Sequence, residues 1–322
     1  MHILVTGASG FVGRALVEHL SSRPGHQVSA ALRDPARLQA APAGVTLRKS
    51  GDLAPDTDWT DALSPQVDAI VHCAARVHVM NETSADPLAE FRRVNVAGTL
   101  NLARQAQAAG VKRFVFVSSI KVNGEQTPPG RPFTADDTPA PMDPYGVSKL
   151  EAEQALLELA RQTGMEVVVV RPVLVHGPGV KANFLSMMRW LDKGVPLPLG
   201  GITGNRRSIV ALDNLVDLID VCLTHPNAAG QVFLASDGED LSTTALLRRV
   251  ARALGKHPLL LPVPAPLLAA AARILGKPAI AQRLCGSLQV DIGKNRQLLN
   301  WTPPVGVDEA LRKTVAAYRN AG

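Results

Sequence analysis

Short runs of apolar, often β-branched residues alternate with longer amphipathic stretches through the first half of the chain. Helical patterns such as AEFRRVNVAGTLNLARQAQAAG lie between several of these runs. Buried strands that alternate with helices predict an α/β protein in which helices cover both faces of a parallel sheet. The predicted strands are HILVT (2–6), QVSAAL (27–32), VTLRK (45–49), DAIVHC (68–73), RFVFVS (113–118) and EVVVVR (166–171).

The pattern changes after Arg171. The segments PVLVHGPG, KGVPLPLGGITG and LPVPAP are rich in proline and glycine, so loops replace the regular alternation of strand and helix. We therefore expect residues 1–171 to form a first domain, to which residues 205–235 return. Residues 172–322 are expected to form mainly a smaller second part.

The most apolar stretch is LLLPVPAPLLAAAARILG, at 259–276. Pro262, Pro264 and Pro266 interrupt it, and it is too short to cross a bilayer, so we expect no integral membrane segment. It predicts a helix from about Pro266 that is buried or faces another subunit, with loose membrane attachment as the alternative. The amino terminus enters HILVTG without a basic region or cleavage site, so we expect no signal peptide and a cytoplasmic protein.

Composition and charge narrow the function classes. The 322 residues are 46% hydrophobic, enough for one large domain or two smaller ones. The net charge is +6, yet lysines and arginines are scattered and aromatic residues make up only 4%. This disfavours a nucleic-acid partner and favours anionic small molecules. Cys73, Cys222 and Cys285 are far apart and form no C-x-x-C pair, so we expect a reduced protein without a metal site.

A glycine-rich turn follows the first predicted strand. In VTGASGFVGRALVEHL, Gly7, Gly10 and Gly13 have the spacing G-x-x-G-x-x-G, and Phe11 and Val12 open the next helix. Glycines let the backbone turn tightly and approach a pyrophosphate, while the helix N-terminus offers free N–H groups. In this strand–turn–helix context the motif predicts dinucleotide binding, with an ordinary glycine-rich turn as the alternative.

The segment DPYGVSK places Tyr145 and Lys149 one helical turn apart. Asp143 suits the N-cap and Pro144 the first helical position, and LEAEQALLELARQTG continues the helix to Gly164. A pair on one helix face can be an ordinary solvated surface or can act together in proton transfer. The tetrad alone leaves both interpretations open.

Further motifs occur with these two in a consistent order. VNVAGTLNL carries Asn95 in an N-x-x-G-T pattern, FVFVSSIKVNGE carries Ser119, and VVVVRPVLVHGPG and VDIGKNRQLLNWTPP follow later. In this combination the chain resembles the extended short-chain dehydrogenase/reductase superfamily, especially its nucleotide-sugar epimerases, dehydratases and reductases. The resemblance covers nearly the whole chain.

The resemblance implies an α/β Rossmann-type doubly wound parallel sheet with a smaller C-terminal substrate-binding part, and an enzyme that transfers hydride. Tyr145 would move a proton, Ser119 would hold the reacting oxygen, and Lys149 would bind the nicotinamide ribose. The Lys149 cation should also lower the pKa of Tyr145 towards neutrality. With Tyr145 and Lys149, the residues expected at the cofactor are Gly7, Gly10, Phe11, Val12, Gly13, Arg33, Asp52, Leu53, Ala74, Ala75, Arg76, Asn95 and Pro172.

The residues after the second predicted strand bear on the choice of cofactor. Family members that prefer NAD carry an acid where this chain has Leu32, and the next residue, Arg33, suits a 2′-phosphate. We therefore expect NADP(H), with NAD(H) second because Asp34 could replace the acid. A net reductase usually draws on NADPH. The segments AARVHVMNE and SSIKVNGE resemble those of enzymes of bacterial surface-polysaccharide synthesis. With Arg33, this resemblance implies reduction of the C4 ketone of a UDP-4-keto-6-deoxy-N-acetylhexosamine.

Two alternatives remain, one in the same superfamily and one from another class of protein. One is a UDP-glucose or UDP-N-acetylglucosamine 4-epimerase that recycles tightly bound NAD, although Val77 and Leu174 depart from residues often found in galactose epimerases. The other is a non-catalytic dinucleotide sensor, which usually loses the tyrosine or lysine that this chain keeps.

At the nucleotide end, the resemblance places Asn183 and Arg207 against a uridine diphosphate. Arg207 is the stronger expectation because a guanidinium can bind phosphate with two hydrogen bonds. A steroid or flavonoid ketone reductase, a further enzymatic rival, would not need these contacts. The resemblance also implies a homodimer formed through helices within 84–109 and 144–163.

Overall fold

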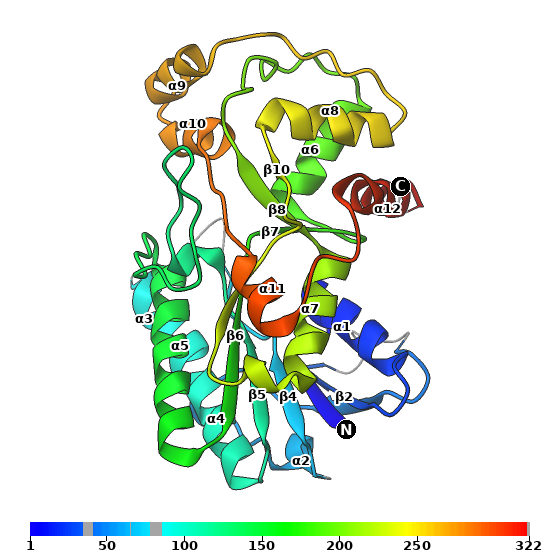
Figure 1. Cartoon of the computed structure of the whole chain (residues 1–322), viewed down its shortest axis with the longest axis vertical. Helices are drawn as coiled ribbons and strands as arrows, with labels where there is room; N and C mark the ends of the chain where they lie inside the picture. Colours follow the sequence, from blue (N-terminus) through cyan, green and yellow to red (C-terminus); the bar gives the residue numbers. More distant parts are fainter. Residues whose placement is uncertain (35–40, 65, 78–85, 321–322) are drawn as a thin grey trace.

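The computed structural model describes residues 1–34, 41–64, 66–77 and 86–320, and its centre is a seven-stranded sheet (Figure 1). The strand order is β3-β2-β1-β4-β5-β6-β9, and every neighbouring pair is parallel. This doubly wound Rossmann-type sheet confirms the predicted fold class. The strands are β1 (His2–Thr6), β2 (Gln27–Leu32), β3 (Thr46–Lys49), β4 (Ala69–His72), β5 (Arg113–Val117), β6 (Glu166–Pro172) and β9 (Val232–Ala235).

All six strands predicted from the sequence are present in this sheet. Five of them form because their apolar side chains are buried on both faces, as in β1, where Ile3, Leu4 and Val5 have no exposed surface. The sixth, β3, lies at the edge of the sheet and is mostly exposed. The strand order reverses between β1 and β4, so the chain leaves these two neighbours in opposite directions. Ligands of such sheets bind in the crevice that this reversal opens at the carboxyl ends of the strands.

Helices cover both faces of the sheet (Figure 1). On one face, Leu16 of α1 and Ile219 of α7 join one buried cluster; on the other, Leu102 of α4 and Leu156 of α5 join a second. The helical segments of this part are α1 (Phe11–Ser21), α2 (Thr60–Leu63), α3 (Pro87–Phe91), η2 (Arg92–Gly98), α4 (Thr99–Ala108), η3 (Ile120–Val122), α5 (Pro144–Thr163), α7 (Leu212–Thr224), η4 (Pro226–Ala228) and α11 (Gly293–Leu299).

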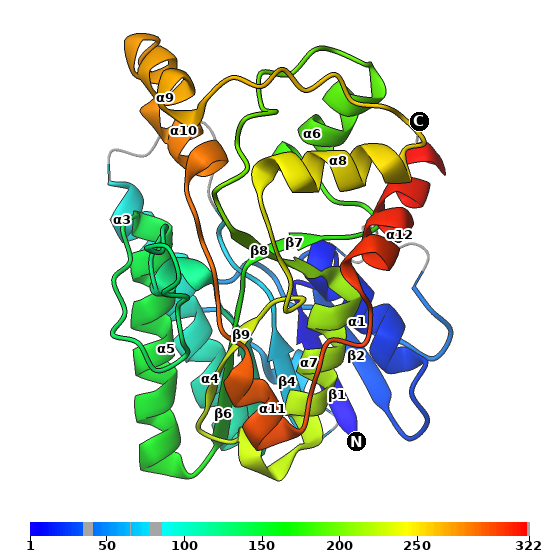
Figure 2. The ribbon, with the colours of Figure 1, turned by 45° about the horizontal axis from the view of Figure 1, so that its top comes forward.

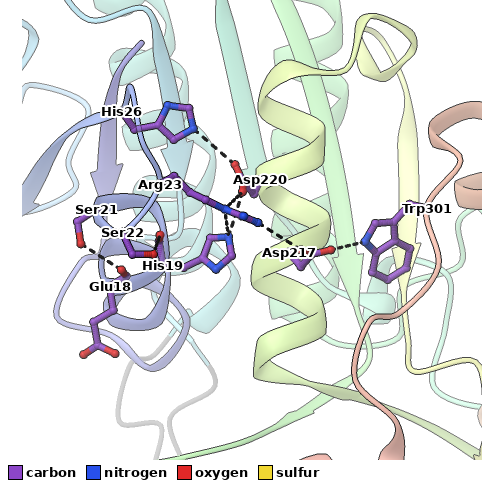
Figure 3. A network of polar contacts seen from close by, with 9 residues as sticks. All are labelled: Glu18, His19, Ser21, Ser22, Arg23, His26, Asp217, Asp220 and Trp301. Atoms are coloured by element: carbon purple, nitrogen blue, oxygen red, sulfur yellow. Dashed lines mark hydrogen bonds and ion pairs between the residues drawn. The ribbon is translucent and has the colours of Figure 1, made fainter.

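A polar network joins α1 to α7 (Figure 3). His19 Nε2 and Arg23 Nε each lie 3.0 Å from Asp220 Oδ2, and Asp217 accepts a 2.8 Å hydrogen bond from the Trp301 indole. Burial opposes ionisation of Asp220, but the His19 hydrogen bond and the charges of His19 and Arg23 leave its pKa below the ordinary value. Side chains from three distant parts of the sequence thus link α7 to α1 and to the chain at Trp301.

A smaller part surrounds the three-stranded sheet β10-β8-β7. Phe184, Met188, Leu247 and Leu311 belong to its own buried cluster. Residues 205–235 belong to both parts, since β8 lies in the small sheet whereas α7 and β9 pack with the large one. The predicted division into two domains stays a prediction. The elements here are β7 (Leu174–His176), α6 (Ala182–Asp192), β8 (Arg207–Ala211), β10 (Asp240–Leu241), α8 (Thr243–Ala253) and α12 (Val307–Asn320).

Two further helices, α9 (Ala265–Ile274) and α10 (Pro278–Cys285), form a hairpin that projects from this smaller part (Figures 1 and 2). No residue of α9 is buried, and the side chain of Ile274 is 85% exposed. The predicted burial of this apolar helix within the chain is therefore wrong, because α9 packs chiefly on α10 and not on a core. No helix within the described ranges is both long and apolar enough to cross a membrane.

Candidate active site

The glycine-rich turn between β1 and α1 is closely packed against the chain that follows β4. The Gly10 N–H donates to the Gly7 carbonyl at 2.8 Å, and Gly7 has a left-handed φ of 65°. A Cβ on Gly7 would lie 2.7 Å from the Ala74 backbone nitrogen, and one on Gly13 would lie 2.2 Å from the Gly7 carbonyl oxygen. Only glycine fits at these two positions, so the bare backbone faces the crevice between β1 and β4.

The first turn of α1 carries unsatisfied backbone amides next to this crevice. Its N-cap, Gly10, has no side chain to accept from them, and no acidic residue lies in the turn, where Phe11 and Val12 are half-buried. Free N–H groups at the positive end of a helix dipole fit a pyrophosphate. The residues after β4, Ala75 and Arg76, continue along the same crevice. The backbone geometry therefore suits a dinucleotide.

Tyr145 and Lys149 lie on the first turns of α5, as the sequence predicts. The helix starts at Pro144 because the Asp143 carboxylate caps it, accepting a hydrogen bond of 2.7 Å from a first-turn N–H. It ends at Gly164, which takes a left-handed φ of 75°. The predicted helix and both of its ends are confirmed.

Lys149 is a buried cation at the carboxyl end of β5. Its ammonium donates to the Val117 carbonyl at 2.8 Å and lies 4.2 Å from the centre of the Phe116 ring, and the side chain is only 2% exposed. Burial lowers its pKa to about 8, while the negative charge of Glu153 acts in the opposite direction. Lys149 therefore stays mostly protonated at neutral pH.

The pKa of Tyr145 is raised, not lowered as the sequence predicts. Burial of the phenol is the larger cause, and the negative charge of Asp143 adds to it. The Lys149 ammonium, bonded to the Val117 carbonyl, does not offset these two effects. The ring packs edge-on against Phe91, with the ring centres 6.0 Å apart. In this structure Tyr145 is accordingly a neutral phenol that holds its proton.

Ser119 lies beside the start of α5. It caps η3 directly after β5, where its Oγ accepts the Lys121 N–H at 3.3 Å. The two segments touch, because a Cβ on Gly146 would lie 2.9 Å from the Lys121 carbonyl oxygen. The carboxyl end of β5 thus brings together Ser119 and the helix turn that carries Tyr145 and Lys149.

Asn95 links the segments around this edge. It lies in the π-helical turn η2 and is 1% exposed. Its amide accepts the Arg76 N–H at 2.8 Å and donates at 3.0 Å both to the Arg76 carbonyl and to the Ser148 hydroxyl. The chain after β4 is therefore fixed to α5 one residue before Lys149.

The residues predicted around the adenine lie at the ends of β2 and β3. Leu32 is buried, whereas Arg33 projects from the surface with Nη1 3.3 Å from Asp52 Oδ1. The two side chains are 66% and 80% exposed, so water and salt screen the pair. The negative charge of Asp52 lies beside the positive charge of Arg33, so Arg33 does not by itself select a 2′-phosphate. Leu53 packs on η2, where a Cβ on Gly98 would lie 3.0 Å from its Cγ.

A buried network under the site was not predicted from the sequence. Glu153, one turn after Lys149 on α5, pairs with Arg171 at 2.6 Å and also accepts a hydrogen bond from the Ser118 hydroxyl. Arg171 donates further to the Asn123 side chain at 2.9 Å. The network thus consists of Ser118, Asn123, Glu153 and Arg171 and does not include Lys149. The available signal was an arginine that ends the wholly apolar run VVVV and a glutamate four positions after the lysine.

Asn183 and Arg207, predicted at the uridine diphosphate, belong to the smaller part. Arg207 begins β8 and donates to the Gly286 carbonyl at 3.2 Å, and burial lowers its pKa. Asn183 is exposed in the first turn of α6. No described hydrogen bond joins them to each other or to Ser119, so their shared role stays a prediction. Pro172, predicted at the cofactor, ends β6.

These groups define what the site can do chemically. A backbone cradle for phosphates, a buried ammonium, a phenol and a serine hydroxyl lie along the carboxyl edge of one sheet. They can hold a dinucleotide and move a proton between an oxygen and the phenol. Within the described ranges no three histidine, cysteine or carboxylate side chains gather in a way that could hold a metal ion.

The sequence matches a known family. Residues 3–235 match the model of the NAD dependent epimerase/dehydratase family. The chain therefore belongs to this family and is an enzyme of the extended short-chain dehydrogenase/reductase type. Over 319 residues it is 48% identical to the UDP-glucose 4-epimerase of Vibrio cholerae. The match covers 99% of this chain and 96% of that relative.

The fold is shared with crystal structures of related enzymes. The UDP-glucuronic acid 4-epimerase of Bacillus cereus, in complex with NAD, superimposes with a TM-score of 0.81 at 20% identity, covering 100% of this chain and 99% of that one. The UDP-glucose 4-epimerase of Thermotoga maritima with UDP-glucose gives a TM-score of 0.77 at 23% identity, with coverage of 100% and 99%. The predicted preference for NADP(H) finds no support among these relatives.

Proposed function

We propose that this enzyme is a UDP-hexose 4-epimerase that works with tightly bound NAD. The observation that carries the proposal is the 48% identity to the Vibrio cholerae UDP-glucose 4-epimerase over 99% of the chain. The sequence alone favours a C4 ketone reductase, mainly because of Arg33. A relationship along the whole chain outweighs one exposed arginine that is paired with Asp52.

The cofactor would lie in the crevice between β1 and β4. Gly7, Gly10 and Gly13 would let the pyrophosphate approach the backbone, and the free amides at the start of α1 would bind it. Asp52 and Leu53 would flank the adenine. When bound there, the nicotinamide supplies the chemistry of taking hydride from C4 of the sugar and returning it.

In the proposed reaction Tyr145 accepts the proton of the C4 hydroxyl during oxidation and gives it back during reduction. Ser119 donates a hydrogen bond to the same oxygen and stabilises the charge that develops on it. Because burial raises the Tyr145 pKa, the phenol needs nearby positive charge to release its proton. Lys149, one turn away and protonated below a pKa of about 8, would supply this charge in the reaction, although its hydrogen bond to the Val117 carbonyl leaves the phenol pKa raised in the present structure.

Inversion at C4 requires the ketone to present its other face before hydride returns. The sugar must therefore turn while the uridine diphosphate stays held. Arg207 is suited to hold it because its backbone is fixed in β8 and its side chain is only partly exposed. Asn183 would add a contact from α6. A homodimer through α4 and α5, the cytoplasm as location and a role in surface-polysaccharide synthesis belong to the same proposal.

A C4 reductase acting on a UDP-4-keto-6-deoxy-N-acetylhexosamine is the second candidate. One observation favours it. Leu32 ends β2, where NAD-preferring members of the short-chain dehydrogenase/reductase superfamily carry an acid, and Arg33 follows. This candidate needs NADPH as a consumed reductant, whereas the epimerase regenerates its cofactor in each turnover.

Assays on the purified protein, first without added cofactor and then with NADPH, separate the two candidates. Incubation with UDP-glucose or UDP-N-acetylglucosamine should give the C4 epimer, measured by anion-exchange chromatography. Heat-denatured protein should release NAD. A protein that carries no nucleotide, leaves both sugars unchanged and oxidises NADPH with a 4-keto sugar would establish the reductase instead.

A further inference from the structure

The α9–α10 hairpin is held firmly at both ends while its helices project from the enzyme (Figures 1 and 2). Before α9, the chain pairs with residues 197–201, and a Cβ on Gly200 or Gly201 would lie only 2.5 or 2.4 Å from the carbonyl oxygens of Leu260 or Val263. After α10, the Asn205 amide donates to the Gly286 carbonyl at 3.1 Å. The projection is therefore a fixed part of the fold.

Exposed apolar side chains are concentrated on this projection. Leu267, Ala270, Ala271 and Ile274 are all exposed and follow the i, i+3, i+4, i+7 spacing of one helix face. Half of the large exposed apolar side chains in the described part of the chain lie here or in the approach to α9: Leu259 (55%), Leu261 (43%), Leu267 (60%), Ile274 (85%), Leu275 (73%) and Ile280 (50%). A patch of this kind normally meets a partner surface.

The charge of the same region has one sign. From 241 to 290 the sequence contains no aspartate or glutamate, and outside this segment basic and acidic residues nearly balance. On the hairpin itself Arg273, Lys277 and Arg283 are exposed, and none has an ion-pair partner within the described residues. The basic residues of the whole segment are Arg248, Arg249, Arg252, Lys256, Arg273, Lys277 and Arg283.

We propose that the α9–α10 hairpin docks this enzyme onto the surface of an anionic lipid bilayer. An exposed apolar helix face flanked by lysine and arginine, without acidic residues, matches a headgroup layer: the apolar side chains enter the acyl boundary and the cations meet lipid phosphates. A second copy of this chain fits less well, because two copies would bring the same uncompensated positive charge together. The helices are too short to span, so attachment is peripheral and reversible.

The attachment would also orient the enzyme. α10 leads directly to Gly286, whose carbonyl accepts the hydrogen bond from Arg207. The backbone that holds Arg207, the residue proposed to bind the uridine diphosphate, therefore follows the hairpin directly along the chain. The docking proposal does not depend on which sugar reaction the enzyme catalyses.

Co-sedimentation with vesicles tests the proposal on the full-length protein. Wild type should pellet with vesicles of equal parts phosphatidylglycerol and phosphatidylcholine, less so in high salt, and stay in solution with phosphatidylcholine alone. Arg273→Glu/Lys277→Glu and Ile274→Ser/Leu275→Ser should each weaken binding by about tenfold or more. The matched control Lys112→Glu/Arg296→Glu changes the same charge on exposed residues of the loop before β5 and of α11, and it should bind as wild type does.

Circular dichroism and activity in free solution should be unchanged in all these variants, which shows that they fold. Failure of wild type to bind the anionic vesicles overturns the proposal. So does equal loss of binding in the control variant, because binding would then follow net charge alone. If wild type ignores vesicles but sediments as an oligomer that Ile274→Ser/Leu275→Ser breaks apart, the surface meets a second copy of the chain instead.

Discussion

Glu153 and Arg171 form an ion pair inside the protein, with Arg171 Nη2 2.6 Å from Glu153 Oε2 and side chains only 2% and 4% exposed. The pair fixes α5 to β6 beneath the proposed catalytic groups. The Glu153 charge also opposes the effect of burial on the pKa of Lys149. One carboxylate thus contributes both to the position of the helix and to the protonation of Lys149.

Removing the charge of Glu153 should be costly. Glu153→Gln leaves the Arg171 guanidinium buried without a counter-charge, so the free energy of unfolding should fall by about 3–5 kcal/mol in urea denaturation. The control, Glu158→Gln, removes an exposed partner of Arg161 on the same helix and should change stability by less than about 1 kcal/mol. Equal effects of the two variants would contradict the importance of the buried pair.

Tyr145→Phe should separate cofactor binding from proton transfer. The ring keeps its contact with Phe91, but no proton can be exchanged with the C4 oxygen, so turnover should fall by about a hundredfold or more. The NAD released on denaturation should equal that of wild type. Near-normal epimerisation by this variant would mean that another group moves the proton.

The burial of Lys149 should make stability depend on pH. Its folded pKa of about 8 is below the ordinary value of 10.5, so between these values the unfolded state binds more protons and stability rises with pH. Lys149→Met keeps the side-chain volume and loses this titration. From pH 7 to about 9.5, the stability of wild type relative to the variant should increase by about 2 kcal/mol, measured by urea denaturation. A constant difference would show that Lys149 keeps an ordinary pKa.

Arg33→Ala tests the choice of cofactor. If the enzyme works with NAD as proposed, wild type should bind NADH more tightly than NADPH in fluorescence titration, and the variant should bind NADH nearly as wild type does. NADPH binding should weaken by about 1–3 kcal/mol, the contribution of a hydrogen bond to a charged group. Tighter binding of NADPH than of NADH by wild type would restore the reductase as the better candidate.

Neighbouring arginines allow a matched test of the nucleotide end. Arg207→Ala should weaken UDP binding by about 2 kcal/mol in calorimetry, because a partly buried guanidinium is lost. Arg206→Ala removes an equal charge whose Nη1 donates to the carbonyls of Thr203 and Asn205, and it should bind UDP almost as wild type does. A larger loss in Arg206→Ala would move the proposed clamp by one position along the chain.

Most strands of the large sheet were predictable because they are short, apolar and buried on both faces, unlike the mostly exposed edge strand β3. The ends of α5 were equally clear, since Asp143, Pro144 and Gly164 have local reasons for their positions. In contrast, the state of Tyr145 depends on burial and on Asp143, which no spacing rule reveals. The side-chain pattern predicts elements; protonation depends on what the fold packs around them.

Two other outcomes depend on contacts between distant residues. Arg33 meets Asp52 at 3.3 Å only because β2 and β3 are neighbours in the sheet. The sequence predicts that the helix α9 is buried or faces another subunit, and within the described part of the chain none of its residues is buried. Hydrophobicity predicts that a surface will be covered and does not tell whether the cover is the same chain.

The π-helical turn η2 has a consequence for how this enzyme can vary. An α-helix turns by about 100° per residue, so loss of one residue between Arg92 and Gly98 would rotate one flank of the helix against the other. Either Asn95 would leave Arg76 and Ser148, or the apolar face of α4 would leave the core. Substitution of the exposed Arg93 should be tolerated, whereas a single-residue insertion or deletion should not, so functional relatives should align here without a gap.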